Sequence, residues 1–239
     1  MAELTLASFN LHFGTGSRTR RFPRFDVVAA CKVLDADVLV LQEAWVPDGG
    51  ESQLDEIAAG LGMEVAADVA LARATVHPHP KVTGRGGTSG FGTWNLAVLS
   101  RLPVLGARTV ALPHLRTDPT DRAVHVVEVR AGTEAFTVAG THLPHLEAGA
   151  LLRRRALRDA LPARGPAALA GDMNMWRWCI RWMAPSGWRG AVRGGTFPAG
   201  RPLSQIDHLV VTPDVGVVSA EVLPDLGSDH RAIRARLRF

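Results

Sequence analysis

The stretch Ala168-Leu169-Ala170-Gly171-Asp172-Met173-Asn174 decides the fold. An apolar run leads into a glycine, and two short polar side chains follow it, two residues apart. Residues i and i+2 of an extended backbone point to the same face, so Asp172 and Asn174 can direct a carboxylate and an amide at one target. Ordinary turns at strand ends use the same residues, because Asp and Asn readily bond nearby backbone groups. The meaning of the stretch therefore depends on the rest of the chain.

Length and composition are those of a globular enzyme or binding protein. The 239 residues, 46% hydrophobic and 21% charged, are enough to bury one large core, and we expect a single domain over residues 1–239 that acts as a monomer. No apolar run reaches the roughly 18–20 residues of a membrane helix, and no secretory signal is visible. The two cysteines, Cys31 and Cys179, favour neither a disulfide framework nor a thiolate metal site. We expect a cytoplasmic, reduced protein.

Charges of opposite sign are segregated along the chain. Residues 33–72 contain nine acidic residues and no Lys or Arg, whereas residues 69–117 contain six Lys or Arg and no acid. Residues 173–206 contain five arginines and no acid. The excess of Arg over Lys, 25 against 2, is explained by the base composition of the genome. Genome composition does not explain why acidic residues are missing from particular segments. The pattern predicts a surface that meets an anion such as phosphate.

Hydrophobic periodicity predicts many strands and few helices. We expect helices over residues 25–34, 51–61 and 147–161, the last with Arg153, Arg154, Arg155 and Arg158 on its solvent side. Residues 70–93 show no periodicity and are predicted to be a loop, either one that binds a ligand or one without a role. Many strands with a few interspersed helices predict an α/β or α+β domain with a large β core. The predicted strands cover residues 4–10, 37–43, 94–100, 104–112, 123–130, 135–142, 166–172, 206–212, 217–222 and 230–239.

Polar residues end or open six of these apolar runs. Each is individually expected to be structural, as a cap, a turn or a satisfied histidine. Their joint occurrence at element ends is improbable by chance and predicts a functional site at one end of the sheets. They are Asn10, Glu43, His142, Asp172 with Asn174, Asp207 with His208, and Asp229 with His230.

Seven short motifs make the chain resemble the endonuclease/exonuclease/phosphatase superfamily, whose members include deoxyribonuclease I, abasic-site endonucleases, sphingomyelinases and inositol-polyphosphate phosphatases. The motifs run in the family's order over nearly the whole chain. The resemblance implies a four-layer α/β/β/α sandwich, in which two facing mixed sheets are flanked by helices, with one divalent-metal site. The motifs are Ser8-Phe9-Asn10, Leu41-Gln42-Glu43, Ala97-Val98-Leu99-Ser100-Arg101, Thr141-His142-Leu143, Gly171-Asp172-Met173-Asn174, Gln205-Ile206-Asp207-His208 and Ser228-Asp229-His230-Arg231.

The resemblance also implies roles for the matching residues. Glu43 is expected to be the main ligand of Mg²⁺ or Mn²⁺, with Asn10 and Asp229 as direct or water-mediated ligands; magnesium prefers such oxygen ligands. Asp172 resembles the residue that orients or deprotonates the attacking water, and Asn174 resembles the residue that holds its geometry and the phosphate. The resemblance further implies that Asp207 and His230 form a carboxylate–imidazole pair that donates to the phosphoryl group, and that His142 is a second donor to the phosphate.

The chain departs from the family pattern at two positions. Some branches carry an aspartate two residues after the first-strand asparagine, where this chain has His12. This difference puts the surroundings of the metal in doubt. His208 stands where an aromatic residue is often found, and the chain contains no tyrosine that could replace His142.

A segment rich in tryptophan and arginine follows the Asp172 motif. In a helix, Arg177 and Arg181 would share one face and Trp178 and Trp182 another. We predict Arg177, Arg181 and Trp178 as substrate-binding residues, which enter a nucleic acid groove, stack on bases or lie at a lipid interface. The alternative is a short helix whose tryptophans pack on the sheet.

The sequence therefore favours a metal-dependent phosphodiesterase or nuclease that acts on nucleic acid, since arginine contacts to phosphate supply most non-specific affinity. A phosphomonoesterase, or a phosphodiesterase for lipid or small-molecule substrates, is the alternative. A third reading, a catalytically inactive phosphate-binding module, is disfavoured because the motif residues are all present.

Overall fold

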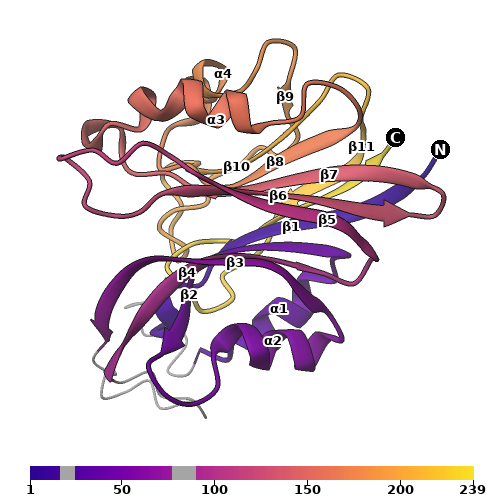
Figure 1. Ribbon diagram of the computed structural model, residues 1–239. Coiled ribbons are helices and arrows are strands. Elements are labelled where there is room, and N and C mark those ends of the chain that lie inside the picture. The colour runs from indigo at the N-terminus through magenta and orange to yellow at the C-terminus, as the bar shows by residue number, and fades with distance from the viewer. Residues whose placement is uncertain (17–24, 77–89) are drawn as a thin grey trace.

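The computed structural model describes residues 1–16, 25–76 and 90–239 of the chain. Within these residues, twelve strands form two six-stranded sheets that pack face to face (Figure 1). The first sheet has the order β11-β12-β1-β2-β4-β3, and the second has the order β5-β6-β7-β8-β10-β9. The strands are β1 (Glu3–Asn10), β2 (Val38–Pro47), β3 (Glu64–Val76), β4 (Gly90–Ser100), β5 (Val104–Ala111), β6 (Ala123–Ala131), β7 (Glu134–His142), β8 (Ala167–Asp172), β9 (Arg189–Gly190), β10 (Asp207–Val211), β11 (Gly216–Val222) and β12 (Ile233–Arg238).

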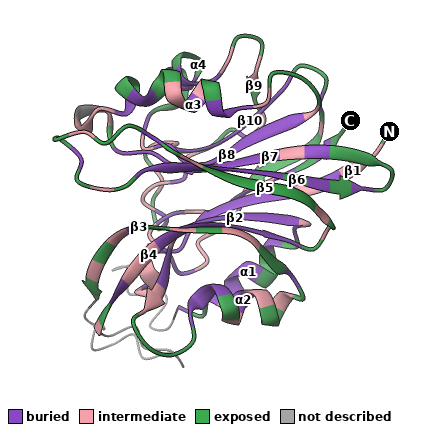
Figure 2. Cartoon of the chain, viewed as in Figure 1, coloured by how far each residue is buried: buried purple, intermediate pink, exposed green. Residues whose placement is uncertain are grey.

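Helices cover the outer faces of both sheets. Helices α1 (Val27–Leu34) and α2 (Gln53–Leu61) lie against the first sheet, and α3 (Arg154–Ala160) and α4 (Ile180–Met183) lie against the second. One buried apolar cluster fills the space between the sheets, and two more fill the spaces between each sheet and its helices (Figure 2). The four-layer α/β/β/α sandwich predicted from the sequence is confirmed.

Strand direction brings the candidate residues to one end of the sandwich. β1 pairs with β2 in parallel, β7 pairs with β8 in parallel, and the other pairings are antiparallel. The carboxyl ends of each parallel pair therefore lie side by side. A side-chain hydrogen bond from Asn10 of β1 to Asp172 of β8, 3.1 Å long, shows that the two pairs end at the same place.

The first two predicted helices are confirmed with small shifts at their ends. α1 begins after Asp26, whose carboxylate accepts a hydrogen bond from the backbone N–H of Ala29. α2 begins after Ser52, which forms a reciprocal capping box with Asp55, and ends at Gly62. Gly62 has φ +63°, a left-handed conformation that favours glycine at a helix end.

The helix predicted over residues 147–161 is interrupted. The structure has two 3₁₀ turns, η2 (Leu146–Ala148) and η3 (Ala150–Arg153), before α3. Gly149 between them has φ +91°, which a continuous α-helix cannot contain. The prediction that Arg153 faces solvent is wrong, because its side chain is fully buried. Arg154 and Arg155 are exposed, and Arg158 is half-buried.

The prediction of a loop over residues 70–93 is also wrong for the part of this range that the structure describes. β3 continues to Val76, and β4 begins at Gly90. The pairing register of β3 with β4 shifts between Val65 and Ala67 and again between Ala70 and Ala72. Each shift breaks the alternation on which sequence-based strand prediction relies. The middle of the predicted loop, residues 77–89, lies outside the described residues.

The remaining predicted strands agree with the structure to within a few residues. At the C-terminal end the predicted alternation is observed, since Ile233, Ala235 and Leu237 of β12 are buried between the sheets. Arg236 and Arg238 point the other way and pair with Glu3 of β1. A helix long and apolar enough to cross a membrane is not found among the described residues.

Candidate active site

Alternation within the strands directs Asn10 and Asp172 into the space between the sheets. Leu4 and Leu6 of β1 face the core between the sheets, and Asn10 continues that face at the strand end. Ala168 and Ala170 of β8 face the same core, and their face continues to Asp172. The apolar faces of two strands therefore end in an amide and a carboxylate that contact each other.

Gly171 allows β7 and β8 to approach closely beside Asp172. Its φ is +153°, and a Cβ atom built on it would lie 1.9 Å from the backbone oxygen of Thr141. Thr141 is its partner in the parallel pairing of β7 with β8, and the next pair in register is His142 with Asp172. Any larger residue at position 171 would push apart the strands that bring His142 and Asp172 together.

Glu43 reaches the site through a β-bulge. The sequence predicts that a strand ends at Glu43, but β2 continues to Pro47, and its register with β4 shifts between Leu41 and Ala44. Leu39 and Leu41 pack toward the helices, so regular alternation would send residue 43 to that side. Glu43 instead has φ +53°, and its carboxylate accepts a hydrogen bond of 3.2 Å from the Asn10 amide. Such strained residues are typical of functional sites.

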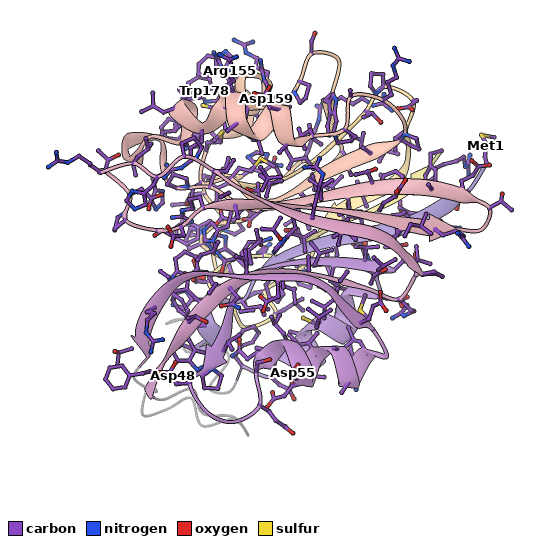
Figure 3. All side chains as sticks on the ribbon, viewed as in Figure 1. Met1, Asp48, Asp55, Arg155, Asp159 and Trp178 are labelled. Carbon is purple, nitrogen blue, oxygen red and sulfur yellow. The ribbon has the colours of Figure 1, made fainter. Side chains whose placement is uncertain are left out.

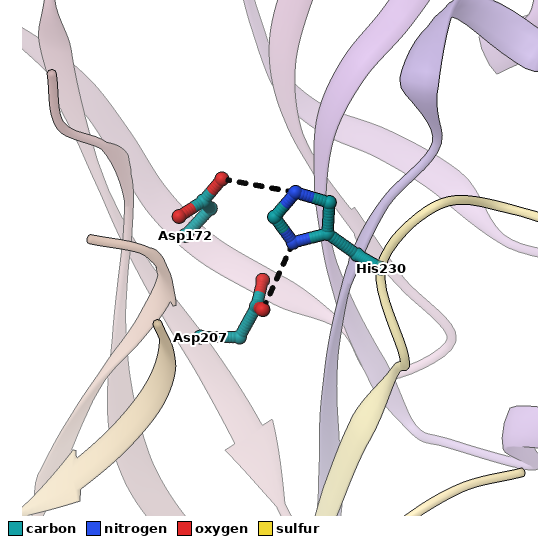
Figure 4. Close-up of side chains that lie close together, drawn as sticks. All are labelled: Asp172, Asp207 and His230. Atoms are coloured by element: carbon teal, nitrogen blue, oxygen red, sulfur yellow. Dashed lines mark hydrogen bonds and ion pairs between the residues drawn. The ribbon is translucent and has the colours of Figure 1, made fainter. Parts of the chain in front are cut away.

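Asp172, Asp207 and His230 form the buried centre of the site (Figure 4). Asp207 is the antiparallel pairing partner of Asp172, and His230 lies in the loop between β11 and β12. Nδ1 of His230 lies 3.0 Å from Oδ2 of Asp207, and Nε2 lies 3.7 Å from Oδ2 of Asp172. The predicted carboxylate–imidazole pair is present in the geometry, and its imidazole bridges two carboxylates.

The three groups shift one another's protonation. Burial raises the pKa of Asp172 to about 7; the nearby Asp207 charge acts in the same direction, and His230 opposes it. Burial alone would lower the pKa of His230, but the charges of Asp207 and Asp172 outweigh it and raise the pKa to about 10. The charged form of His230 is therefore favoured at neutral pH, and Asp172 holds a proton more readily than an ordinary aspartate.

His142 and Asn174 close the site on the side of β7. Nε2 of His142 lies 3.6 Å from Asp172 and 3.3 Å from the Asn174 side-chain nitrogen. Burial lowers the pKa of His142 well below its usual value, and Arg122 and His230 lower it further, so His142 is neutral and does not form an ion pair with Asp172. Asn174 has φ +49°; its backbone N–H donates to Asp172, and its side chain donates to the Leu143 carbonyl.

Asp229 lies at the outer edge of the site and pairs with His12. Nδ1 of His12 is 2.6 Å from Oδ2 of Asp229. Burial alone would raise the pKa of Asp229, but the hydrogen bond and charge of His12 lower it below its usual value. The residue that departs from the family pattern therefore contacts one of the predicted metal ligands directly.

Two sets of residues could hold a cation. Asp172, Asp207 and His230 offer ligand atoms within 4.8 Å of one another. His230, however, is held as an imidazolium, which has no lone pair for a metal and already balances the two carboxylates. The predicted set offers the carboxylates of Glu43 and Asp229, while the Asn10 amide directs its nitrogen at Glu43 and Asp172 and its oxygen accepts from the backbone N–H of His12. Burial raises the pKa of Glu43, and the Asp229 charge raises it further, so a cation there would relieve the cost of ionising Glu43. These residues fit a hard divalent cation.

The predicted substrate-binding residues lie on the surface beyond the site. The tryptophans do not pack on the sheet: Trp176, Trp178 and Trp182 are 53%, 54% and 37% exposed. Arg177 and Arg181 are exposed as well. Arg177 belongs to the 3₁₀ turn η4 (Arg177–Cys179), which runs directly into α4. His208 points away from Asp207, and its Nε2 lies 2.8 Å from the backbone oxygen of Met175.

Sequence reasoning missed a buried charged group behind His142. The guanidinium of Arg122 donates to the His142 carbonyl, pairs with Asp118 and lies 5.4 Å from the centre of the Trp94 ring. Arg153 of η3 places Nη2 3.1 Å from the same Asp118 carboxylate. The one signal in the sequence was the i,i+4 spacing of Asp118 and Arg122, which is common on protein surfaces.

Comparisons with known proteins identify the fold and the family. None of the curated proteins compared with the chain matches it. Among solved structures, an endonuclease/exonuclease/phosphatase from Beutenbergia cavernae has 23% identity and a TM-score of 0.74, with 100% of this chain and 72% of that chain covered. A mannosyl-6-phosphatase from Bacteroides thetaiotaomicron has 20% identity and a TM-score of 0.66, with 99% and 100% covered. ANGEL2, a 2′,3′-cyclic phosphatase in complex with adenosine-2′,3′-vanadate, has 15% identity and a TM-score of 0.64, with 99% and 95% covered.

These likenesses establish the fold, while their differing activities leave the substrate open. The model of the endonuclease/exonuclease/phosphatase family matches residues 7–230, which include every candidate residue of the site. The chain is a member of the endonuclease/exonuclease/phosphatase family and a hydrolase of phosphate esters.

Proposed function

We propose that the protein is a divalent-metal-dependent phosphodiesterase that acts on nucleic acid, and that residues 1–239 form one catalytic domain active as a monomer. The observation that carries the proposal is the buried centre in which His230 lies between Asp172 and Asp207. An acid and a base lie side by side there, as cleavage of a phosphate ester requires. The carboxylate of Glu43 is close by, linked to Asp172 through Asn10.

Glu43 is the proposed main ligand of Mg²⁺ or Mn²⁺, with Asn10 and Asp229 as direct or water-mediated ligands. The Asn10 amide donates to Glu43 and to Asp172, so it sets the spacing of the two carboxylates. A bound cation would neutralise charge that develops on the phosphoryl oxygens.

Asp172 is the proposed base that orients or deprotonates the attacking water. Its pKa of about 7 suits a base at neutral pH, because a base works best when its pKa is near the operating pH. The backbone N–H of Asn174 donates to Oδ1, at 2.9 Å, and Asn10 donates to Oδ2. These two bonds fix the carboxylate so that a lone pair can point toward a water molecule.

His230 is the proposed donor to the leaving group or to a phosphoryl oxygen. Asp207 accepts a hydrogen bond from Nδ1–H, so that Nε2–H faces Asp172. His142 is neutral and is proposed as a second donor to a phosphoryl oxygen; its Nε2 lies 3.6 Å from Oδ2 of Asp172. A positioned acid or base of this kind contributes roughly 10²–10⁴ in rate.

Nucleic acid is favoured as the substrate by the charge beside the site. The five arginines of residues 173–206 have no acidic residue among them, and Arg177, Arg181 and Trp178 are exposed. Phosphates of a polymer on both sides of the cleaved bond would meet these guanidinium groups. Hydrolysis of a phosphomonoester or of a lipid or small-molecule diester is the second candidate; one structural neighbour is a mannosyl-6-phosphatase.

Three substrates separate these candidates. Supercoiled plasmid, the small diester bis(p-nitrophenyl) phosphate and p-nitrophenyl phosphate are incubated with Mg²⁺ or Mn²⁺, with and without chelator. Nicking of the plasmid and hydrolysis of the diester, both abolished by chelator, are the expected result. Intact plasmid under every metal condition, together with release of phosphate from the monoester, would contradict the proposal and favour the second candidate.

A further inference from the structure

An exposed aromatic surface begins directly after the Asp172 motif. The indole rings of Trp176 and Trp178 lie nearly parallel, with their centres 5.9 Å apart and 21° between their planes. Trp182 meets Trp178 edge to face, with centres 5.1 Å apart. More than half of Trp176 and of Trp178 is exposed. Trp178 projects from the outer layer above α3 in Figure 3. Clusters of large exposed apolar side chains usually mark a binding surface.

The surface is hollowed beside the rings. A shallow, largely open depression of about 620 Å³ is lined by Trp176, Arg177, Trp178, Gly194, Leu203, Ser204 and Gln205. One wall is formed by indole and guanidinium groups, and Leu203, which is 79% exposed, belongs to the other. The depression therefore offers a flat aromatic wall with a positive charge beside it.

Both walls are anchored to the candidate active site. Trp176 follows Asn174 by two residues, and Gln205 precedes Asp207 by two, a separation that spans at most about 7 Å of backbone. His208 holds the backbone of Met175 at the start of the aromatic wall. The Gln205 side chain donates to the Val192 carbonyl and accepts from the backbone N–H of Gly194. A substrate in the active site would thus extend directly onto this surface.

The surface carries positive charge that is complementary to an anionic partner. Arg177 and Arg181 are exposed, and neither forms an ion pair within the described part of the chain. The Arg181 guanidinium lies 5.7 Å from the centre of the Trp182 ring, which holds it over the aromatic cluster. Alternating guanidinium groups and indole faces match alternating phosphates and bases.

We propose that Trp176, Trp178 and Arg177 form a subsite that stacks an unpaired base of the nucleic acid substrate, next to the nucleotide whose phosphate is cleaved. This inference rests on the proposed function. An unpaired base presents an open ring face to an indole, whereas a base in a duplex has both faces covered by its neighbours. The subsite therefore selects single-stranded or frayed nucleic acid over continuous duplex. The exposed guanidinium groups of Arg177 and Arg181 beside the indole rings match a phosphate next to each base, which favours nucleic acid over a lipid surface.

Binding is tested in the Asp172→Asn background with chelator present, so that no turnover occurs. A fluorescent single-stranded 12-mer and its duplex are titrated by anisotropy. Trp178→Ala is expected to weaken single-strand binding by about 5- to 150-fold, from the stacking contribution of one base, with a smaller effect on the duplex. Trp178→Phe, which keeps an aromatic face, is expected to recover most of the binding.

Two control variants remove exposed side chains far from the site. Leu105→Ala on β5 removes an apolar side chain and Arg130→Ala on β6 removes a cationic one, both at the far end of the second sheet from His142. Both controls are expected to leave single-strand binding and duplex binding unchanged.

Two further measurements separate failure of the subsite from failure of the proposed function. Wild-type protein that hydrolyses bis(p-nitrophenyl) phosphate but whose single-strand binding is unaffected by Trp178→Ala retains the function and contradicts the subsite. Wild-type protein that hydrolyses no diester contradicts the function itself. Binding to vesicles of phosphatidylserine and phosphatidylcholine is the other measurement. Loss of vesicle binding in Trp178→Ala, with unchanged oligonucleotide binding, would identify a lipid-facing surface and overturn the subsite.

Discussion

Asp172 and Asp207 face each other at paired positions of the antiparallel strands β8 and β10, and both are 1% exposed. Two carboxylates buried side by side repel each other unless one is protonated or a cation lies between them. The His230 ring supplies that positive charge in the structure. The placement of the Asp172 and Asp207 carboxylates therefore serves catalysis and lowers the stability of the folded protein.

Asp172→Asn is expected to abolish hydrolysis, with a loss of at least about 10²-fold, while leaving the fold as stable or more stable. The folded pKa of Asp172 is raised to about 7 from 3.8, so its ionisation destabilises the metal-free fold progressively as the pH rises from about 4 through about 7. The difference in Tm between variant and wild type, measured in chelator, should grow in favour of the variant from pH 4 to pH 8. A large fall in the variant's Tm at pH 8 would mark Asp172 as structural.

Glu43→Gln is expected to remove most of the stabilisation by divalent metal. Mg²⁺ or Mn²⁺ should raise the Tm of the wild type, because a ligand that binds only the folded state stabilises it by about 2.7 kcal/mol at 100 times its Kd. The glutamine side chain has no charge to attract the cation, so the Tm of the Glu43→Gln variant should rise much less when metal is added. Glu128→Gln, an exposed position on β6, is the control and should respond as the wild type does. Equal metal shifts in all three proteins would exclude Glu43 as the main ligand.

Asp118→Leu is expected to destabilise the protein by about 3–5 kcal/mol, because it leaves the buried guanidinium groups of Arg122 and Arg153 without their shared carboxylate. Arg153→Met should cost clearly less, since Asp118 and Arg122 remain paired. Urea unfolding of the two variants measures the difference. The reverse order would show that Asp118 does not hold this group together.

His125 should make the protein sensitive to acid. The ring is fully buried, with Nε2 2.9 Å from the Leu96 carbonyl and Nδ1 2.8 Å from the Thr109 hydroxyl, which satisfies the neutral form. Burial lowers its pKa from 6.5, so the stability that depends on the neutral ring is present above pH 6.5 and is lost as the pH falls below it. His125→Gln keeps an amide donor and removes the titration. The Tm of the wild type should fall more steeply than that of His125→Gln between pH 7.5 and pH 5, and parallel curves would contradict this.

Alternation and strand ends made much of the site predictable. Asn10 and Asp172 continue apolar faces, and a period of two extends from the core into the site without interruption. The position of Glu43 is different, because it depends on a bulge and a positive φ that the pattern of residues 37–43 does not contain. The sequence identified Glu43 as the polar residue at the end of an apolar run and as part of a motif, but it did not indicate the bulge that turns its side chain into the site.

The features that the sequence did not predict share one cause. In each, the chain departs from a regular helix or strand, and contacts between residues far apart in the sequence stabilise the departure. Gly149 interrupts the helix predicted over residues 147–161, and the interruption turns Arg153 inward to Asp118. Register shifts in β3 concealed a strand that lies at the edge of the first sheet. Neither the pairing of Arg153 with Asp118, 35 positions away, nor that of His12 with Asp229, 217 positions away, can be read from local patterns.

The most direct test of the account is the rate of bis(p-nitrophenyl) phosphate hydrolysis as Mn²⁺ is titrated into metal-free protein, for wild type, Glu43→Gln and the Glu128→Gln control. We predict saturable activation of the wild type and the control, reversal by chelator, and a greatly increased metal requirement or no activity for Glu43→Gln. Hydrolysis by the wild type that is indifferent to chelator, or unchanged activation of Glu43→Gln, would contradict the account.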